Sequence, residues 1–370
     1  MKSGFRILDS DMHLREPADL WEKYMDSQWR EHAPKILGST ARSSAMVLLE
    51  GKILQGYNPS YRGGIFDATR IDKELGEYRA RGFDAASQLH AMDREGLDVA
   101  ALYPSIGLGI MMRSEMEPKL AAAIARAYND WLHDFCRADP KRLKGVAMVP
   151  LHDPSEAVKE AQRAVGKLGF VGVFARPEPL RNLPWHSRYF DALWSALEEL
   201  DAPLGFHSAA AAGEAPQIGD RFGDNLLLRH VVSHPLENMM AMVDTIGGGV
   251  CARHPKLKLA FLECYCGWAP FLLHRMDNAM EKGRYPTAGN LKPSEYFKRQ
   301  CWISTEHEKE LPMAVELLGA DNIVFSTDYP HGDSDFPNAV EEFLEMDGVS
   351  NESRKKILWD NCAKLYGLDT

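Results

Sequence analysis

The chain has 370 residues, of which 45% are apolar and 26% charged, and its formal net charge is −10. These values are typical of a soluble globular protein, and the length suits one large α/β barrel or two ordinary domains. The acidic balance argues against nucleic acid as a partner, because no basic stripe could contact phosphates. We find no apolar stretch of membrane-span length and no signal-peptide region, so we expect a cytoplasmic protein that does not bind membranes.

The first predicted strand covers residues 6–11 and ends on Asp11, with His13 close behind it. Side chains two positions apart leave the same face of an extended backbone. Asp11 and His13 can therefore chelate one metal ion, which makes a metal-dependent enzyme the first hypothesis.

Residues 35–80 are rich in Gly, Tyr and Arg and predict an irregular insertion after the first strand. Long loops inside compact domains are usually functional, so we expect a lid over the site, with a dimer arm as the alternative. The side chains that suggest a lid are Tyr57, Tyr61, Arg62 and Phe66.

Strand-type and helix-type segments alternate through the rest of the chain. Apolar periodicity and stop signals predict helices over residues 86–96, 117–138, 154–167, 189–200, 234–252, 269–282 and 311–318. Strands are predicted at residues 6–11, 98–103, 143–149, 171–176, 203–207, 257–263, 301–304 and 322–327. This alternation predicts a single (β/α)₈ barrel domain over residues 1–370. A doubly wound sheet would show a Gly-rich phosphate turn after the first strand, and none is present there.

The catalytic residues of such barrels lie at the carboxyl ends of the strands. Most predicted strands end on or near ligand-type side chains, namely Asp11, His13, Arg176, His207, Glu263, Glu306, His307, Asp328 and His331. Imidazoles and carboxylates together form a mixed N/O site suited to Zn²⁺, Mn²⁺ or Fe²⁺. Asp328 could ligate the ion, take a proton from an ion-activated water, or do both.

Several short motifs carry a family resemblance, at residues 9–17, 92–98, 172–174, 205–207, 254–259, 267–270, 325–331 and 361–368. With these motifs the chain resembles the amidohydrolase superfamily, in the amidohydrolase-related branch that includes aminocarboxymuconate semialdehyde decarboxylase and γ-resorcylate decarboxylase. The resemblance implies a distorted TIM barrel. It also implies one metal ion bound by Asp11, His13, His207 and Asp328.

Two residues depart from the pattern of these relatives. Asp11 stands where the superfamily usually has the first His of His-x-His, although some relatives carry an acidic residue there. Glu263 stands where the decarboxylases place an acid/base His at the end of the sixth strand. A carboxylate there could ligate a metal, complete a binuclear centre or act as a base, but it donates a proton poorly at neutral pH unless burial raises its pKa.

Each candidate also has a plainer interpretation. Glu263 could pair with Arg176, while His234 and His331 could orient loops instead of contacting substrate. Arg176, His331 and His307 are the candidate substrate-binding residues. The remaining imidazoles are predicted to lie on the surface or in packing positions, at His90, His133, His152, His186, His230, His254 and His274.

The sequence leaves three functions open. The first is a metal-dependent hydrolase acting on an amide, ester, thioester or lactone-like bond of a small molecule, with Asp328, Glu263 and His234 as catalytic residues. The second is a metal-dependent non-oxidative decarboxylase of a hydroxyaryl or unsaturated carboxylic acid, and the third is a metal or ligand binder without activity. We expect one or two divalent ions, zinc first and Mn²⁺ or Fe²⁺ as alternatives, in a homodimer or a higher homo-oligomer.

Overall fold

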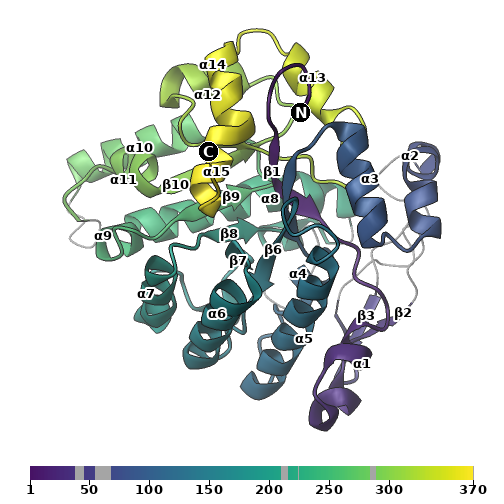
Figure 1. The fold of residues 1–370 in the computed structure, drawn as a ribbon. Coiled ribbons are helices and arrows are strands. Elements are labelled where there is room, and N and C mark those ends of the chain that lie inside the picture. The colour runs from purple at the N-terminus through teal and green to yellow at the C-terminus, as the bar shows by residue number, and fades with distance from the viewer. Residues whose placement is uncertain (38–45, 55–67, 210–215, 224, 284–288, 370) are drawn as a thin grey trace.

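The computed structural model describes residues 1–37, 46–54, 68–209, 216–223, 225–283 and 289–369. At its centre, eight parallel strands form one sheet in chain order (Figure 1). They are β1 (Leu8–His13), β5 (Val99–Tyr103), β6 (Leu143–Met148), β7 (Gly172–Ala175), β8 (Leu204–His207), β9 (Leu259–Leu262), β10 (Cys301–Thr305) and β11 (Ile323–Phe325). All eight predicted strands are confirmed, and so is the distorted barrel.

The distortion lies at the seam between the last strand and the first. Neighbouring strands pair through backbone hydrogen bonds from β1 to β11, but within the described residues the first and last strands form no such ladder. Side chains bridge the gap: Ser10 Oγ donates to the Phe325 carbonyl at 2.8 Å, and Thr327 Oγ1 donates to Asp9 Oδ2 at 2.5 Å. The barrel is therefore nearly closed, and the polar ends of β1 and β11 lie side by side.

At least one helix lies between each two consecutive barrel strands and covers the outside of the barrel (Figure 1). The longer helices are α2 (Ala68–Ala80), α3 (Ala85–Glu95), α5 (Pro118–Cys136), α6 (Pro154–Leu168), α7 (Asp191–Glu199), α8 (Leu226–Met242), α10 (Ala269–Lys282), α11 (Pro293–Gln300) and α12 (Leu311–Leu318). Shorter ones are α1 (Leu20–Tyr24), α4 (Gly107–Ile110), α9 (Val250–Arg253), α13 (Ala339–Glu345), α14 (Asn351–Lys355) and α15 (Asn361–Tyr366). None of the described helices is long and apolar enough to cross a membrane.

Local signals explain why most helix predictions are close to the observed bounds. At the start of α6, the Asp153 carboxylate accepts hydrogen bonds from the backbone N–H groups of Ser155 and Glu156, which satisfies donors that the helix itself cannot pair. At its end, Gly169 adopts a φ of 73°, a conformation that favours glycine.

The predicted helix over residues 234–252 is wrong at both ends. α8 begins at Leu226 and ends at Met242, with Pro235 inside it. Proline mimics the first-turn signal of a helix start, so the sequence pattern places the start too late. Gly249, at φ 83°, then interrupts the helical path before α9 begins.

The insertion after β1 is more regular than predicted. It contains an antiparallel sheet of β2 (Lys35–Leu37), β3 (Met46–Leu49) and β4 (Lys52–Leu54), followed by α2 at one side of the barrel (Figure 1). Residues 38–45 and 55–67, which include the four side chains that suggested a lid, lie outside the described residues. Arg113 anchors the sheet to the barrel by donating to the Leu49 carbonyl at 3.0 Å.

Candidate metal centre

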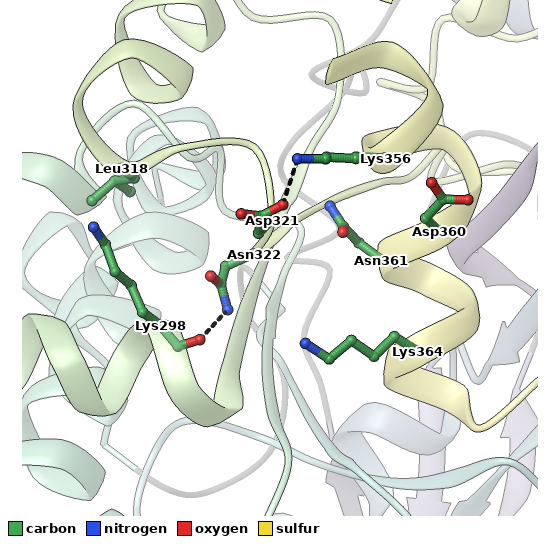
Figure 2. A pocket seen from close by; sticks show the side chains of 8 residues that line it. All are labelled: Lys298, Leu318, Asp321, Asn322, Lys356, Asp360, Asn361 and Lys364. Carbon is green, nitrogen blue, oxygen red and sulfur yellow. Dashed lines mark hydrogen bonds and ion pairs between the residues drawn. The ribbon is translucent and has the colours of Figure 1, made fainter. Parts of the chain in front are cut away.

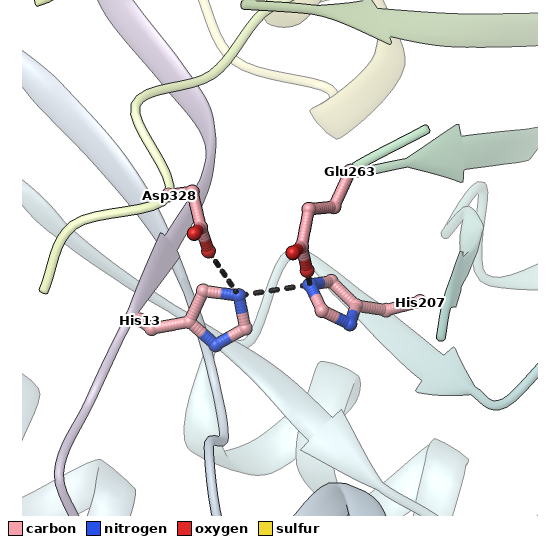
Figure 3. A group of neighbouring side chains, drawn as sticks. All are labelled: His13, His207, Glu263 and Asp328. Carbon is pink, nitrogen blue, oxygen red and sulfur yellow. Dashed lines mark hydrogen bonds and ion pairs between the residues drawn. The ribbon is translucent and has the colours of Figure 1, made fainter. Parts of the chain in front are cut away.

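Four side chains from four strand ends meet at the mouth of the barrel (Figure 3). His13 ends β1, His207 ends β8, and Glu263 and Asp328 follow β9 and β11. Each offers one ligand atom, and these atoms all lie within 4.8 Å of one another. The carboxyl ends of parallel strands share one rim, which is why residues so far apart in sequence converge.

The two imidazoles point the same ring nitrogen at a common place. Nδ1 of His13 faces the Pro104 carbonyl at 2.8 Å, and Nδ1 of His207 faces the Ser208 carbonyl at 2.7 Å. A carbonyl only accepts, so each Nδ1 carries a proton and each neutral ring presents a bare Nε2. These Nε2 atoms lie 2.8 Å apart, a distance that requires a shared cation, either a proton or a metal ion.

Asp11 lies close to both imidazoles. Its Oδ1 is 3.4 Å from His13 Nε2, and its Oδ2 is 3.4 Å from His207 Nε2. The side chain is fully buried, and neither oxygen has a hydrogen-bond partner among the described residues. Burial raises the pKa of Asp11 from 3.8 to about 8. A buried carboxylate without donors is costly unless a cation compensates it, so the residues present fit a divalent metal ion.

The same electrostatics act on His207. Burial opposes a charge on its ring, but Asp11 and Glu263 outweigh burial and raise the pKa of His207 to about 9. In the metal-free pocket a proton on His207 therefore supplies part of the positive charge that the surrounding carboxylates require. His13, which has less compensation against its burial, has a pKa well below its usual value.

Asp328 connects the centre to His331, an imidazole that lies outside it. Its Oδ1 lies 3.4 Å from His13 Nε2 and 2.6 Å from Nδ1 of His331, whose Nε2 lies 2.9 Å from Ser105 Oγ. Burial, reinforced by neighbouring carboxylates including Glu263, raises the pKa of Asp328 well above its usual value.

Both strand-end carboxylates sit on strained backbone. Asp328 has a φ of 53° and Glu263 a φ of 47°, in the left-handed region that non-glycine residues rarely adopt. Strain of this kind persists where the surrounding structure enforces it, and it concentrates at functional sites.

Glu263 divides its two oxygens between two imidazoles. Oε2 lies 2.9 Å from His207 Nε2, and Oε1 lies 3.2 Å from His234 Nδ1. Burial opposes the charge, yet His234 and His207 outweigh it and hold the pKa of Glu263 well below its usual range. Arg176 does not pair with Glu263: its guanidinium forms a two-pronged ion pair with Glu178, at 2.9 and 2.5 Å.

Two other candidates lie outside this group. His307 is 39% exposed and its Nδ1 pairs with Glu342 at 3.1 Å, so it is not part of the candidate metal centre. Arg176 is buried, and besides its pairing with Glu178 it donates to the Ala209 carbonyl at 3.1 Å. Its charge is largely neutralised before any ligand arrives.

His230 is predicted from the sequence to lie on the surface or in a packing position, but this residue lies beside the centre. Its ring centroid is 4.9 Å from that of His234, and its Nε2 is 2.9 Å from Asp333 Oδ2. The i, i+4 spacing of His230 and His234 could have revealed the pair, but the predicted helix began at His234 and left His230 outside it.

A surface pocket of about 590 Å³ lies elsewhere (Figure 2). Residues that precede β10 and β11 help to line it, so it lies at the end of the barrel opposite the metal centre. Its lining, which contains no imidazole or thiol, consists of Lys298, Leu318, Asp321, Asn322, Lys356, Asp360, Asn361 and Lys364.

The family model described as amidohydrolase matches residues 9–368. The chain belongs to this amidohydrolase family. Among curated proteins, a γ-resorcylate decarboxylase from Polaromonas sp. is 27% identical, over 80% of this chain and 92% of that protein. The resemblance to the branch that contains this decarboxylase is confirmed.

Solved structures agree on the fold. An amidohydrolase from Mycobacterium avium subsp. paratuberculosis is 24% identical and covers 98% of this chain and 100% of its own, with a TM-score of 0.80. A dihydroxybenzoic acid decarboxylase from Polaromonas sp., solved with manganese and the inhibitor 2-nitroresorcinol, is 20% identical, with a TM-score of 0.66. It covers 98% of this chain and 97% of its own.

The prediction of a hydrolase is wrong. Several curated relatives, among them γ-resorcylate decarboxylases from Polaromonas sp. and Rhizobium sp., are decarboxylases, so the comparisons favour the carboxy-lyase alternative. Glu263, in place of an acid/base His, was the residue that favoured hydrolysis. One strand-end residue does not fix the reaction, because Asp328 offers a second group able to carry a proton.

Proposed function

We propose that the protein is a metal-dependent, non-oxidative decarboxylase of a hydroxyaryl or unsaturated carboxylic acid. The observation that carries the proposal is the convergence of His13, His207 and Asp328 in a chain similar to γ-resorcylate decarboxylases over most of its length. The two parts of this observation support different parts of the proposal. The geometry supports an ion at the mouth of the barrel, and the relatives support the reaction.

Asp11, His13, His207 and Asp328 would hold the ion, with Glu263 as a further ligand. A divalent ion bound there supplies the positive charge that anchors the oxygens of an anionic substrate. Two imidazoles with several carboxylates form an oxygen-rich donor set, which suits Mn²⁺. The similar Polaromonas decarboxylase carries manganese, so we propose Mn²⁺ in place of the zinc expected from sequence.

Asp328 would deliver the proton in the chemical step. Its proton forms the new C–H bond at the carbon that bears the carboxylate, and the bond to that carboxylate then breaks. The electron pair of that bond restores the unsaturated system, and carbon dioxide leaves. A proton from solvent would then reprotonate Asp328 by way of His331, which lies 2.6 Å from Asp328 and 2.9 Å from Ser105 Oγ, so each turnover takes up one proton and consumes no water.

Glu263 and His234 would play supporting parts in this reaction. Glu263 Oε2 lies 2.9 Å from His207 Nε2, the nitrogen that would face the ion, so Glu263 is placed to be a further ligand, while the Ser208 carbonyl orients the ring through Nδ1. His234 neighbours the other oxygen of Glu263 and would steady its charge.

A panel assay tests the reaction. The protein, stripped by chelator and reloaded with Mn²⁺, is incubated in D₂O with dihydroxybenzoates, carboxyvanillates and conjugated unsaturated carboxylic acids. We expect carbon dioxide release and one deuterium at the vacated ring position, detected by mass spectrometry. An Asp328→Asn variant should give neither, while His274→Ala, on an outer helix, should behave as wild type. Failure of every hydroxyaryl and unsaturated acid in the panel, with the ion bound, would contradict the proposal.

We also propose a homo-oligomer. Exposed apolar side chains on α8 support it, because Leu227 and Val231 are 49% and 59% exposed one helical turn apart. Light scattering after size-exclusion chromatography measures the mass directly, and a monomer at micromolar concentration would contradict it.

A further inference from the structure

We propose that His230, His234 and Glu263, supported by Asp333, form a second divalent-cation site that shares Glu263 with the first. The three ligand atoms of His230, His234 and Glu263 lie within 4.8 Å of one another. The site takes a metal ion, not a substrate, and its existence does not depend on which reaction the enzyme performs.

The helix supplies the first two ligands. His230 and His234 lie four residues apart in α8, so their side chains leave the same face of the helix one turn apart. Their ring centroids are 4.9 Å apart. Two histidines at this spacing on one helix are a common way to hold a single metal ion.

A buried nitrogen of His234 that makes no hydrogen bond points to a missing ligand. His234 is 8% exposed, and its Nδ1 makes no hydrogen bond within the described part of the chain, although it lies 3.2 Å from Glu263 Oε1. A buried polar atom left without a partner costs free energy that a bound cation would recover.

Glu263 can serve both sites at once. Its Oε2 faces His207 in the first site (Figure 3), while its Oε1 faces His234 in the second. A carboxylate that directs one oxygen to each of two imidazoles has the arrangement of a bridging ligand. The strained backbone at Glu263, with a φ of 47°, fixes this orientation.

Asp333 adds a fourth donor atom, a carboxylate oxygen, and a second negative charge. Its Oδ2 lies 2.9 Å from His230 Nε2. Arg70 of α2 holds the surrounding loop by donating to the carbonyls of Gly332 at 2.5 Å and Ser334 at 2.8 Å. The two carboxylates carry two negative charges, which balance the two positive charges of a divalent ion. Two imidazoles and two carboxylates are a donor set suited to Mn²⁺ or Zn²⁺.

The competing interpretation is that His234 only orients Glu263. In that case Glu263 serves the first site alone, and the protein binds one ion. The two interpretations therefore differ in the number of ions per chain, which can be measured without any substrate.

The experiment counts bound manganese. Wild-type protein is stripped with chelator, dialysed against Mn²⁺ and analysed by mass spectrometry for ions per chain, with low-temperature electron paramagnetic resonance on the same samples. We expect two ions per chain and the broadened, exchange-coupled spectrum of two ions that share a carboxylate. The spectrum is recorded on the unaltered protein, so it does not depend on a variant that folds.

Variants assign the second ion. His230→Gln and His234→Gln should each bind one ion and show the uncoupled spectrum, while His274→Ala, an exposed histidine of α10, should bind two. One ion per wild-type chain, or two ions retained by both Gln variants, would overturn the proposal. Loss of decarboxylation in the panel assay would leave the ion count unaffected, so the two proposals fail separately.

Discussion

The two ends of the barrel treat charge in opposite ways. At the carboxyl end, Asp11 and Asp328 are buried, and no Lys or Arg ion pair to either carboxylate occurs within the described residues. At the other end, in the pocket of Figure 2, Lys356 lies 2.9 Å from Asp321, which is 70% exposed. Water screens the ion pair of Lys356 and Asp321, so the charges at that end are balanced without a ligand.

The difference shows where an ion belongs. Buried carboxylates gathered around the imidazoles favour a cation in the site, and the raised pKa values of Asp11, Asp328 and His207 are consistent with this. The exposed lysines and aspartates at the opposite end occur in similar number and require no bound ion, because water stabilises their charges. A cluster of ligand-type residues therefore indicates a metal site when it is buried and its negative charges lack compensating positive charges. Matched substitutions at the two ends of the barrel can test this.

The largest effect is expected from Asp328→Asn. The amide keeps the shape of the side chain but cannot carry the reacting proton, so kcat should fall by about 10³-fold at saturating Mn²⁺. Asp321→Asn makes the same chemical change at the opposite end and should leave kcat within about twofold. Steady-state kinetics on a substrate found in the panel measures both. Equal losses in the two variants would show that the effect is not local to the mouth.

A smaller effect is expected from Asp11→Asn on metal affinity. Removal of this carboxylate from between His13 and His207 should weaken Mn²⁺ binding by about 10-fold or more. Titration calorimetry of the stripped protein measures the affinity, with Asp321→Asn again as the control. Unchanged affinity in Asp11→Asn would remove this residue from the ligand set.

The pH dependence of metal-free stability should come next in size. The folded-state pKa of Asp11 is raised from 3.8 to about 8, so between these pH values the folded protein holds a proton that the unfolded chain has released. Stability must then fall as pH rises from about 4 to about 8. In thermal unfolding with chelator, wild-type Tm should lose at least about 2 °C more than Asp11→Asn over this range. With Mn²⁺ bound, the difference in slope should disappear, and its persistence would contradict the role of Asp11.

The barrel and its rim could be predicted because both depend on local patterns. Short apolar runs marked all eight strands, most of which end on or near ligand-type residues, and the rule that strand ends share one rim brought His13, His207 and Asp328 together. The approach of Asp333 to His230 could not be predicted, because it depends on a loop conformation and on a helix whose true start lies before Pro235.

The reaction was the least predictable feature. Imidazole and carboxylate donors determine that a divalent ion can bind, and hydrolases and decarboxylases both use such an ion. The difference between them lies in the substrate and in which group carries the proton. Glu263 by itself favoured hydrolysis, which was wrong, and only the comparison with relatives corrected the prediction of the reaction.

The smallest effect is expected from Lys356→Ala at the opposite end of the barrel. Its ion pairs with Asp321 and Glu352 are exposed to solvent, so the free energy of unfolding should change by no more than about 0.5 kcal/mol. Denaturant unfolding measures the change, and added salt should reduce it further because screening already weakens the pair. A loss above about 2 kcal/mol would show that this end, too, depends on a specific charge. The contrast with the mouth, where Asp11 is predicted to affect both ion binding and the pH dependence of stability, would then no longer hold.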